Sequence, residues 1–215
     1  MPALEHFITR RLKKTQIDEF FAEELQRAGY SGVDIQKTPL GTRVIIYAAR
    51  PGMVIGRRGK NVKIMTQILE ERYGIENPQI EVSEIEVPEL NAKVMAQRLT
   101  GRLERGTHYR RATYSILRRV KAAGAKGVEI KVSGKLSGHR SRYKKFRDGF
   151  VAKCGEPANE WVDKAVSYAV LKKGVIGVSV KIMRPTGLLP NEIEIIEMPP
   201  REKEKKDTEE EVGAS

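Results

Sequence analysis

The chain has 215 residues, of which 40% are hydrophobic and 32% are charged, and its formal net charge at pH 7 is +12. This length suits one large or two small domains, and the charge predicts an acidic partner, either nucleic acid or an anionic membrane surface. The sequence has no apolar run near the ~20 residues of a membrane span, and its N-terminus lacks the apolar core of a signal peptide. We therefore expect a cytoplasmic protein that does not act in a membrane.

Residues that bind metals or form disulfides are scarce. Cys154 is the single cysteine, which excludes an intramolecular disulfide and a thiolate cage. The three histidines, His6, His108 and His139, are too widely separated to have metal-ligand spacing. We expect no metal and no cofactor.

Positive charge is concentrated in the middle of the chain. Residues 191–215 hold nine acidic and four basic residues, so residues 1–190 carry a net charge of +17. Between Arg102 and Arg147 there are fifteen basic residues and two acidic ones. A helix face that meets only solvent usually mixes the two signs, so this segment indicates an acidic ligand.

The first elements in chain order are a helix and two strands. Residues 1–14 show little pattern, but Thr15 is a suitable N-cap, and apolar residues recur at helical spacing from there until Gly29. Strands are then expected at 33–38 and 43–49, joined by a hairpin-like turn.

The next stretch, VIGRRGKNV at residues 54–62, predicts a Gly-x-x-Gly turn between two short helical pieces. Gly56 and Gly59 lack a Cβ, so a ligand can come close to the main chain. The amides that open the following helix can donate hydrogen bonds to a phosphate. Three cations, Arg57, Arg58 and Lys60, surround that position.

A helix at 60–73 and a strand at 80–87 complete the order helix, strand, strand, helix, loop, helix, strand. This is the order of the type II KH fold, and the loop resembles the KH loop that clamps a nucleic-acid backbone. By that resemblance, the candidate RNA-backbone clamp consists of Gly56, Arg57, Arg58, Gly59 and Lys60.

The same motif has other interpretations. A P-loop and a dinucleotide fingerprint both need a glycine where the chain has Val54, and a P-loop also needs Ser or Thr where it has Asn61. The two glycines could also be turn residues whose neighbouring arginines only aid solubility. Because arginine fills both variable positions, we expect contacts to phosphate rather than base reading.

After Pro88, helices are expected at 89–104 and 107–123. At about 100° per residue, the second helix has a buried stripe made of Tyr109, Ala112, Thr113, Ile116, Val120 and Ala123. Its opposite side groups four cations and one aromatic residue, which could face one ligand or only solvent. These five residues are Arg110, Arg111, Tyr114, Arg118 and Lys121.

The rest of the chain predicts strands. One is expected at 128–133, followed by a turn into a basic strand within 133–146, and another at 178–183. Residues 159–171 fit a helix or a strand, and a strand is preferred because a hairpin tip follows. Trp161 and Tyr168 are expected in the core and His139 in a turn. The low-complexity tail from about residue 199 is expected to be disordered.

Four stretches together resemble the universal small-subunit ribosomal protein three in its archaeal form. They are RAGYSGVDI at 27–35, VIGRRGKNV at 54–62, YRRA at 109–112 with GAKGVEIKVSGKLSG at 124–138, and GVIGVSVKIM at 174–183. The resemblance implies an α+β protein of two small domains. These are a type II KH domain at 1–87 and a two-layer α/β domain with a mixed sheet at 88–190, followed by an acidic tail at 191–215.

The resemblance also implies a function. The protein would be a structural constituent of the head of the small subunit, not an enzyme, and would act in cytoplasmic ribosomes. Its partners would be small-subunit ribosomal RNA, messenger RNA and neighbouring ribosomal proteins of the head, with no membrane. Ribosomal RNA contacts are expected from Lys131, Lys135, Arg140, Arg142, Lys144, Lys145 and Arg147.

In that family an arginine pair lines the channel through which messenger RNA enters and is associated with unwinding structured messengers. The corresponding residues here are Arg110 and Arg111. Bacterial members place a lysine three residues later, where this chain has Tyr114, which offers stacking or hydrogen bonding instead of charge.

Two other classes of function remain open. A free-standing KH regulator of messenger RNA would share the loop, although it would not need residues 88–185 in this form. A nuclease would need clustered carboxylates for metal, and a lyase that acts on damaged DNA would need a lysine with a lowered pKa.

Overall fold

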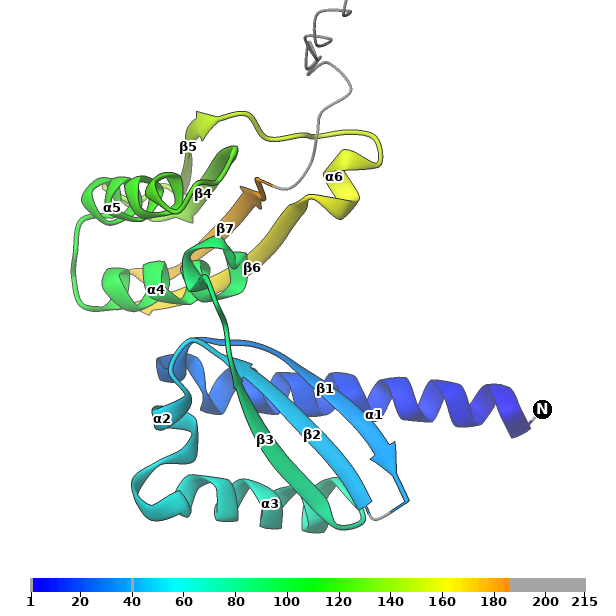
Figure 1. Cartoon of the computed structure of the whole chain (residues 1–215). Helices are drawn as coiled ribbons and strands as arrows, with labels where there is room; N and C mark the ends of the chain where they lie inside the picture. Colours follow the sequence, from blue (N-terminus) through cyan, green and yellow to red (C-terminus); the bar gives the residue numbers. More distant parts are fainter. Residues whose placement is uncertain (1, 40, 186–215) are drawn as a thin grey trace, which may run out of the picture.

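The computed structural model describes residues 2–39 and 41–185, with side chains from Phe7 onward. Within these ranges the chain forms two sheets, one in each half, and helices cover one face of each (Figure 1). The expected α+β class is confirmed. The expectations for the tail concern residues outside the described ranges.

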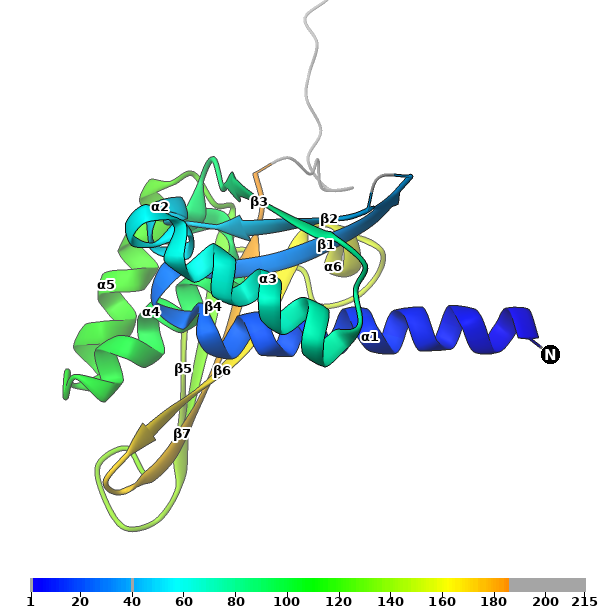
Figure 2. The same cartoon turned by 90° about the horizontal axis from the view of Figure 1, so that it is seen from below.

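The N-terminal sheet has the strand order β1-β2-β3. β1 (Tyr30–Thr38) and β2 (Gly41–Ala48) form an antiparallel hairpin, and β3 (Pro78–Glu84) lies parallel to β2. The parallel pairing is possible because the helices between β2 and β3 provide the crossover that parallel strands require. Helices α1 and α3 lie together on one side of this sheet (Figure 2).

Helix α1 spans Pro2–Glu24, so the expectation that the helix begins at Thr15 was wrong. Thr15 lies inside the helix, where its Oγ1 donates to the carbonyl of Arg11 at 3.1 Å. From Phe7 onward, the buried apolar side chains of α1 lie in its second half, among them Ile17 and Phe21. The first half extends beyond the sheet (Figures 1 and 2), which explains its lack of apolar periodicity. From residue 7 to residue 14 this half is rich in arginine and lysine, which are good helix formers, and Lys14 forms an ion pair with Asp34 of β1 at 3.1 Å.

The core of the N-terminal half joins α1, the sheet and α3 (Lys60–Tyr73). The bounds of α3 agree with the prediction, and Gly74 ends the helix in the left-handed conformation, with its N–H donating to the carbonyls of Leu69 and Glu70. The largest fully buried side chains of this core are Tyr30, Phe21, Ile17, Ile46, Leu69 and Val44.

A short connection leads into the second half. The 3-10 turn η3 (Pro88–Leu90) precedes α4 (Ala92–Glu104), so this helix begins three residues later than expected. Asn91 caps it by accepting from the N–H of Val94 at 3.2 Å. The same side chain donates to the Ser31 hydroxyl of β1 at 2.6 Å, so the helix cap also contacts the N-terminal sheet.

The C-terminal sheet has the order β5-β4-β7-β6. Its strands are β4 (Gly127–Gly134), β5 (Arg142–Gly149), β6 (Val162–Leu171) and β7 (Gly174–Met183), and every pairing is antiparallel. The expected two layers are present, but the expectation of a mixed sheet in this half was wrong. Only the four-residue helix α6 (Pro157–Glu160) lies between these strands, so the long crossover needed for a parallel pair is missing.

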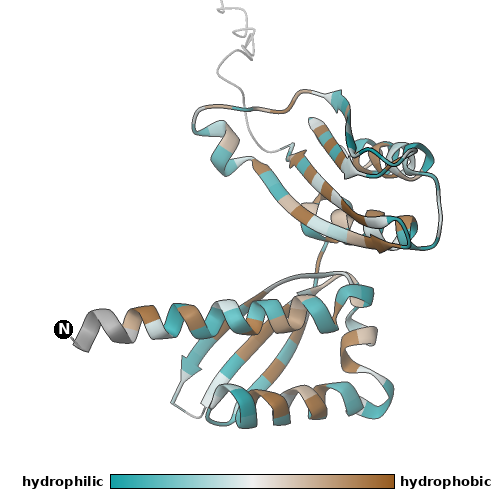
Figure 3. Cartoon of the chain, turned by 180° about the vertical axis from the view of Figure 1, so that it is seen from behind, coloured by the Kyte–Doolittle hydropathy of each residue, from teal (hydrophilic) through white to brown (hydrophobic). Residues whose placement is uncertain are grey.

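Helices α4 and α5 (Tyr109–Ala122) cover one face of this sheet, α4 over β6 and β7 and α5 over β4 and β5. Hydropathy alternates along the strands (Figure 3), as expected for a sheet with one buried face. Trp161 is half-buried against a small cluster around α6, in line with a core role. Tyr168 is 67% exposed, so its expected place in the core was wrong. It alternates with the inward-facing Ala169 and points to the opposite face.

Candidate nucleic-acid interface

The Gly-x-x-Gly turn joins helix α2 (Pro51–Ile55) to α3 through the 3-10 turn η2 (Arg57–Gly59), as the sequence predicted. Gly56 and Gly59 have positive φ values of 71° and 70°. Arg58, between them, is also left-handed at φ 54°, a conformation that costs a non-glycine residue on the order of 1–3 kcal/mol. The arginine therefore occupies a strained position, of the kind that concentrates at binding sites.

The two glycines have different physical roles. A Cβ on Gly56 would lie 2.6 Å from the Asn61 side chain, whose amide donates to the carbonyl of Met53 at 3.2 Å and ties α3 to α2. A Cβ on Gly59 would meet nothing within 4 Å. Gly56 is therefore required by the internal packing of the loop, whereas Gly59 presents open backbone to a ligand.

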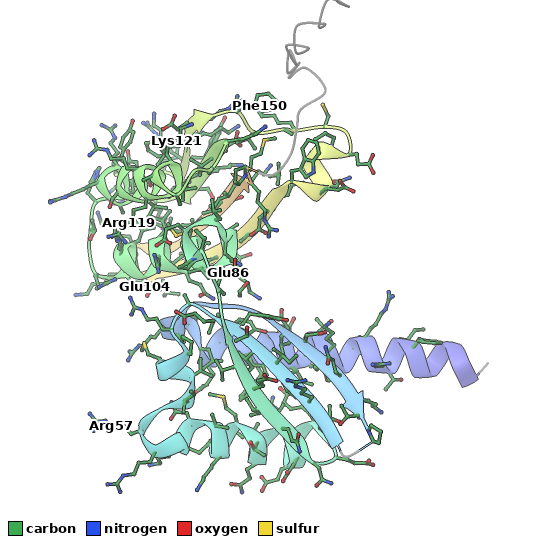
Figure 4. The ribbon with its side chains drawn as sticks, viewed as in Figure 1. Arg57, Glu86, Glu104, Arg119, Lys121 and Phe150 are labelled. Atoms are coloured by element: carbon green, nitrogen blue, oxygen red, sulfur yellow. The ribbon has the colours of Figure 1, made fainter. Side chains whose placement is uncertain are left out.

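The cations of the loop face solvent. Arg57, Arg58 and Lys60 are exposed, and Figure 4 shows Arg57 reaching outward from the turn between α2 and α3. Within the described residues none of the three forms an ion pair with a carboxylate. The loop thus combines open backbone at Gly59 with unneutralised positive charge, which is the chemistry that binds phosphate.

The second candidate surface is the solvent side of α5. His108 caps this helix by accepting from the N–H of Arg110 through Nδ1 at 3.4 Å, a role that the sequence analysis missed. The buried stripe is largely as predicted, except that Leu117 belongs to it and Ala123 is only half-buried. All five residues predicted for the opposite side are exposed and lie together. We call Arg110, Arg111, Tyr114, Arg118 and Lys121 the α5 surface.

Aromatic contacts hold two members of the α5 surface in place. The Arg110 Nε donates to the Tyr109 hydroxyl at 3.2 Å, and its guanidinium lies 5.8 Å from the centroid of the Tyr109 ring. The ring of Tyr114 meets Phe146 of β5 edge to face, at a centroid distance of 5.3 Å. Tyr114 is nevertheless 51% exposed, so it offers part of its ring to a ligand while β5 fixes its position.

A second group of arginines lies where α4 packs against α5. Arg102 of α4 donates to the Ser115 hydroxyl of α5 at 2.7 Å, and burial lowers its pKa, with Arg119, Arg105 and Arg98 adding repulsion. Figure 4 shows Arg119 on the side of α5 toward α4. These four arginines were not predicted as site residues, because their proximity depends on how α4 packs against α5.

The seven cations predicted to contact ribosomal RNA do not share one face. Register with β4 places Arg142 and Lys144 on the helix-covered side, beside Phe146. Lys145 and Arg147 point to the other side, together with Lys131. Lys135 and Arg140 belong to the connection between β4 and β5, and His139, as expected, lies in its bends. The basic strand therefore supplies two surfaces, one continuous with α5 and one across the open side of the sheet.

Two features of the described residues bear on other classes of function. No group of three or more His, Cys, Asp or Glu residues in this part of the chain could hold a metal ion. No helix in the same part is long and apolar enough to cross a bilayer.

Comparison with known families agrees with this geometry. A KH domain profile matches residues 16–91, and the profile described as "Ribosomal protein S3, C-terminal domain" matches residues 99–182. Together they define an RNA-binding ribosomal protein with a KH domain. The KH match begins within α1, so the projecting first half of that helix lies outside it.

Several archaeal proteins named "Small ribosomal subunit protein uS3" are close relatives. The one from Methanobrevibacter smithii is 52% identical over 195 residues, which cover 91% of this chain and 77% of the relative. The one from Methanocaldococcus jannaschii is 53% identical over 191 residues, which cover 89% of this chain and 92% of the relative. The chain belongs to the uS3 family of small ribosomal subunit proteins, a family of ribosomal constituents and not of enzymes.

Proposed function

We propose that the chain is built into the head of the small ribosomal subunit in the cytoplasm. In that place it would bind ribosomal RNA and line the channel through which messenger RNA enters. The names of its relatives support the ribosomal place, and the two cationic surfaces support the RNA contacts. Residues 1–87 would act as the KH unit and residues 88–190 as the unit that presents α5.

In this proposal the Gly-x-x-Gly clamp binds ribosomal RNA backbone. The open backbone at Gly59 and the free cations Arg57, Arg58 and Lys60 suit phosphate, which carries no sequence information. The clamp therefore anchors the protein with little sequence preference and with strong dependence on salt.

The α5 surface, in turn, contacts the messenger. The observation that carries this part is the exposure of four cations and Tyr114 on one side of one helix, without an acidic residue on α5. Like charges at this spacing repel one another unless an anion lies nearby. Arg110 is already oriented by Tyr109, so it loses little freedom when it binds a phosphate.

The test is translation by small subunits that carry Arg110→Ala and Arg111→Ala together. Compared with the unmodified chain, the double variant should slow translation of structured messengers more than translation of unstructured ones. An equal effect on both kinds of messenger would contradict a role in the channel. Lys37→Ala with Lys172→Ala, which removes two exposed cations outside α5, is the matched control.

A further inference from the structure

The face of the C-terminal sheet opposite α4 and α5 is largely uncovered. At one end of this face, Val162 and Met183 are buried under the cluster around α6. Toward the other end, β6, β7 and the connection between β4 and β5 extend past the helices (Figure 2). Apolar side chains there are exposed to solvent: Val166 is 63% exposed, Val170 71% and Val175 55%. An exposed patch of this kind marks a binding surface.

The strand register shows what this open face carries. One row across the sheet reads Tyr143, Ser133, Gly177 and Tyr168. The next reads Lys145, Lys131, Ser179 and Val166, and the one after that Arg147, Glu129, Lys181 and Lys164. The aromatic row and the charged rows are therefore adjacent.

The aromatic row carries one exposed tyrosine on each edge strand of the sheet. Tyr143 is 65% exposed and Tyr168 67%, and they stand three strand spacings, or about 14 Å, apart. The small residues Ser133 and Gly177 lie between them and leave a hollow of about 390 Å³. Exposed tyrosines are suited to stacking of nucleic-acid bases, since every base offers a π face.

The charged rows surround the same hollow. Lys131, Lys145 and Lys181 line it, and the Nζ of Lys131 lies 5.2 Å from the centroid of the Tyr143 ring. Against the five cations of these rows stands a single carboxylate, that of Glu129. This charge surplus favours a polyanion and disfavours a basic partner.

Glu129 helps to line the hollow and provides an acceptor for a base there. The residue is only 7% exposed, and its Oε2 is buried without a hydrogen-bond partner. The nearest ammonium groups, those of Lys145 and Lys153, are each 3.9 Å from a Glu129 oxygen, too far for a hydrogen bond. A buried acceptor left unsatisfied is costly, and an exocyclic amino group of a base is a donor that could satisfy it.

We propose that the open face of the C-terminal sheet, bearing Tyr143, Tyr168, Lys131, Lys145 and Glu129, binds single-stranded RNA. Bases stack on the two tyrosines, the lysines contact phosphates, and a base farther along the strand donates its amino group to Glu129. Single-stranded RNA fits better than a duplex, whose bases are already stacked on one another. The site is separate from the α5 surface, which lies on the other side of the sheet, and from the clamp, which lies in the other half. Lys131 and Lys145 were already expected to contact ribosomal RNA, and the new element is a single-strand site that adds Tyr143, Tyr168 and Glu129 to them.

The experiment measures binding of fluorescein-labelled twelve-nucleotide oligocytidylate and oligouridylate to the full chain by fluorescence anisotropy. Combined Tyr143→Ala and Tyr168→Ala should weaken binding of both by about tenfold or more. Combined Tyr143→Phe and Tyr168→Phe should leave binding nearly unchanged, because the rings remain. Lys172→Ala, an exposed change at the hairpin tip outside the three rows, should also leave binding nearly unchanged.

A second variant tests the base contact. Cytosine has an exocyclic amino group and uracil does not, so the unmodified chain should prefer oligocytidylate. Glu129→Gln should reduce that preference, because an amide can also donate to the O4 of uracil. A preference unaltered by this substitution would overturn the Glu129 contact.

Photocrosslinking with 4-thiouridine then locates the RNA. The proposal predicts crosslinked peptides from β5 and β6 in a chain that also carries Arg110→Ala and Arg111→Ala, so its outcome is independent of the α5 surface. The proposal would be overturned if crosslinks were confined to other elements and the double alanine and double phenylalanine variants of Tyr143 and Tyr168 bound the oligonucleotides with equal affinity. The open face would then belong to an acidic protein partner.

Discussion

Lys93 of α4 places its Nζ 3.3 Å from Asp18 Oδ1 of α1 and 4.5 Å from the centroid of the Tyr30 ring of β1. The Tyr30 hydroxyl donates to the same Asp18 oxygen at 2.5 Å. One lysine thus links the first helix of the C-terminal half to two elements of the N-terminal half. With the contact between Asn91 and Ser31, this junction sets the orientation of the clamp relative to the α5 surface.

Removal of the lysine should loosen the junction. Lys93→Ala deletes a partly exposed ion pair and a cation–π contact, together worth about 1 kcal/mol. In a chain of this size we expect Tm to fall by roughly 2–4 °C. Thermal unfolding followed by circular dichroism measures the change, with Lys37→Ala as the exposed control. A Tm equal to that of the control would show that the junction adds no stability.

Tyr30 should make stability dependent on pH in the alkaline range. Burial first, and then the hydrogen bond and charge of Asp18, raise the pKa of Tyr30 above its ordinary value. In the unfolded chain the phenol ionises near pH ~10, whereas in the folded chain it stays protonated. The stabilisation is therefore complete below that pH and is lost as the pH rises above it.

Urea unfolding at a series of pH values between neutral and strongly alkaline tests this assignment. The free energy of unfolding of the unmodified chain should fall more steeply in the alkaline range than that of Tyr30→Phe. Parallel curves would contradict the assignment. Tyr168→Phe is the matched control, since Tyr168 is exposed in the folded chain.

The two loop glycines should respond differently to alanine. In Gly56→Ala the new Cβ would clash with Asn61, 2.6 Å away, in addition to the strain of a positive φ. Gly59→Ala meets only the conformational penalty, about 1–2 kcal/mol, but places a methyl group where a phosphate would approach. We expect the larger loss of Tm in Gly56→Ala and, in Gly59→Ala, weaker RNA binding with most of the stability kept.

Gly52→Ala is the reference for both substitutions. Gly52 lies in α2 with nothing within 4 Å of the added Cβ, and its φ is not positive. This variant should keep or slightly raise Tm. If Gly59→Ala bound RNA as tightly as Gly52→Ala, the ligand would not approach the loop at Gly59.

Charge reversal at the clamp should weaken RNA binding in a salt-dependent manner. Arg57→Glu with Arg58→Glu removes two exposed cations, and the slope of log K against log salt should become shallower by about 0.7–0.9 for each lost phosphate contact. Filter binding of RNA to the full chain over a salt series measures the slope. Lys37→Glu with Lys172→Glu, both at exposed positions, controls for the same change in net charge, and equal slopes in the two double variants would contradict the clamp.

Local chemistry in the sequence predicted the loop and the helix after it, because the glycines, the cations and the end of α3 at Gly74 are short-range signals. The α5 surface was predictable too, since helical spacing alone separates Arg110 from Ile116. The start of α1 was missed because its first half extends beyond the sheet and carries no apolar period. Tyr168 was misplaced because alternation along β6 shows that two faces exist but not which one the helices cover.

The arginine group around Arg102 and the open face of the C-terminal sheet could not be predicted from the sequence. Both depend on contacts between residues far apart in the chain, such as Arg102 with Ser115 and Tyr168 with Gly177. Strand order and register bring these residues together, and neither could be derived from local pattern.

The proposed contact between the α5 surface and the messenger can be tested directly on assembled small subunits. Messengers with 4-thiouridine downstream of the decoding site can be bound to assembled small subunits and irradiated, and the crosslinked peptides identified by mass spectrometry. Crosslinks are expected within the peptide of α5 between Arg110 and Lys121, and combined Arg110→Ala and Arg111→Ala should reduce their yield. Crosslinks of undiminished yield in that variant, or none to α5 in the unmodified subunit, would contradict this contact.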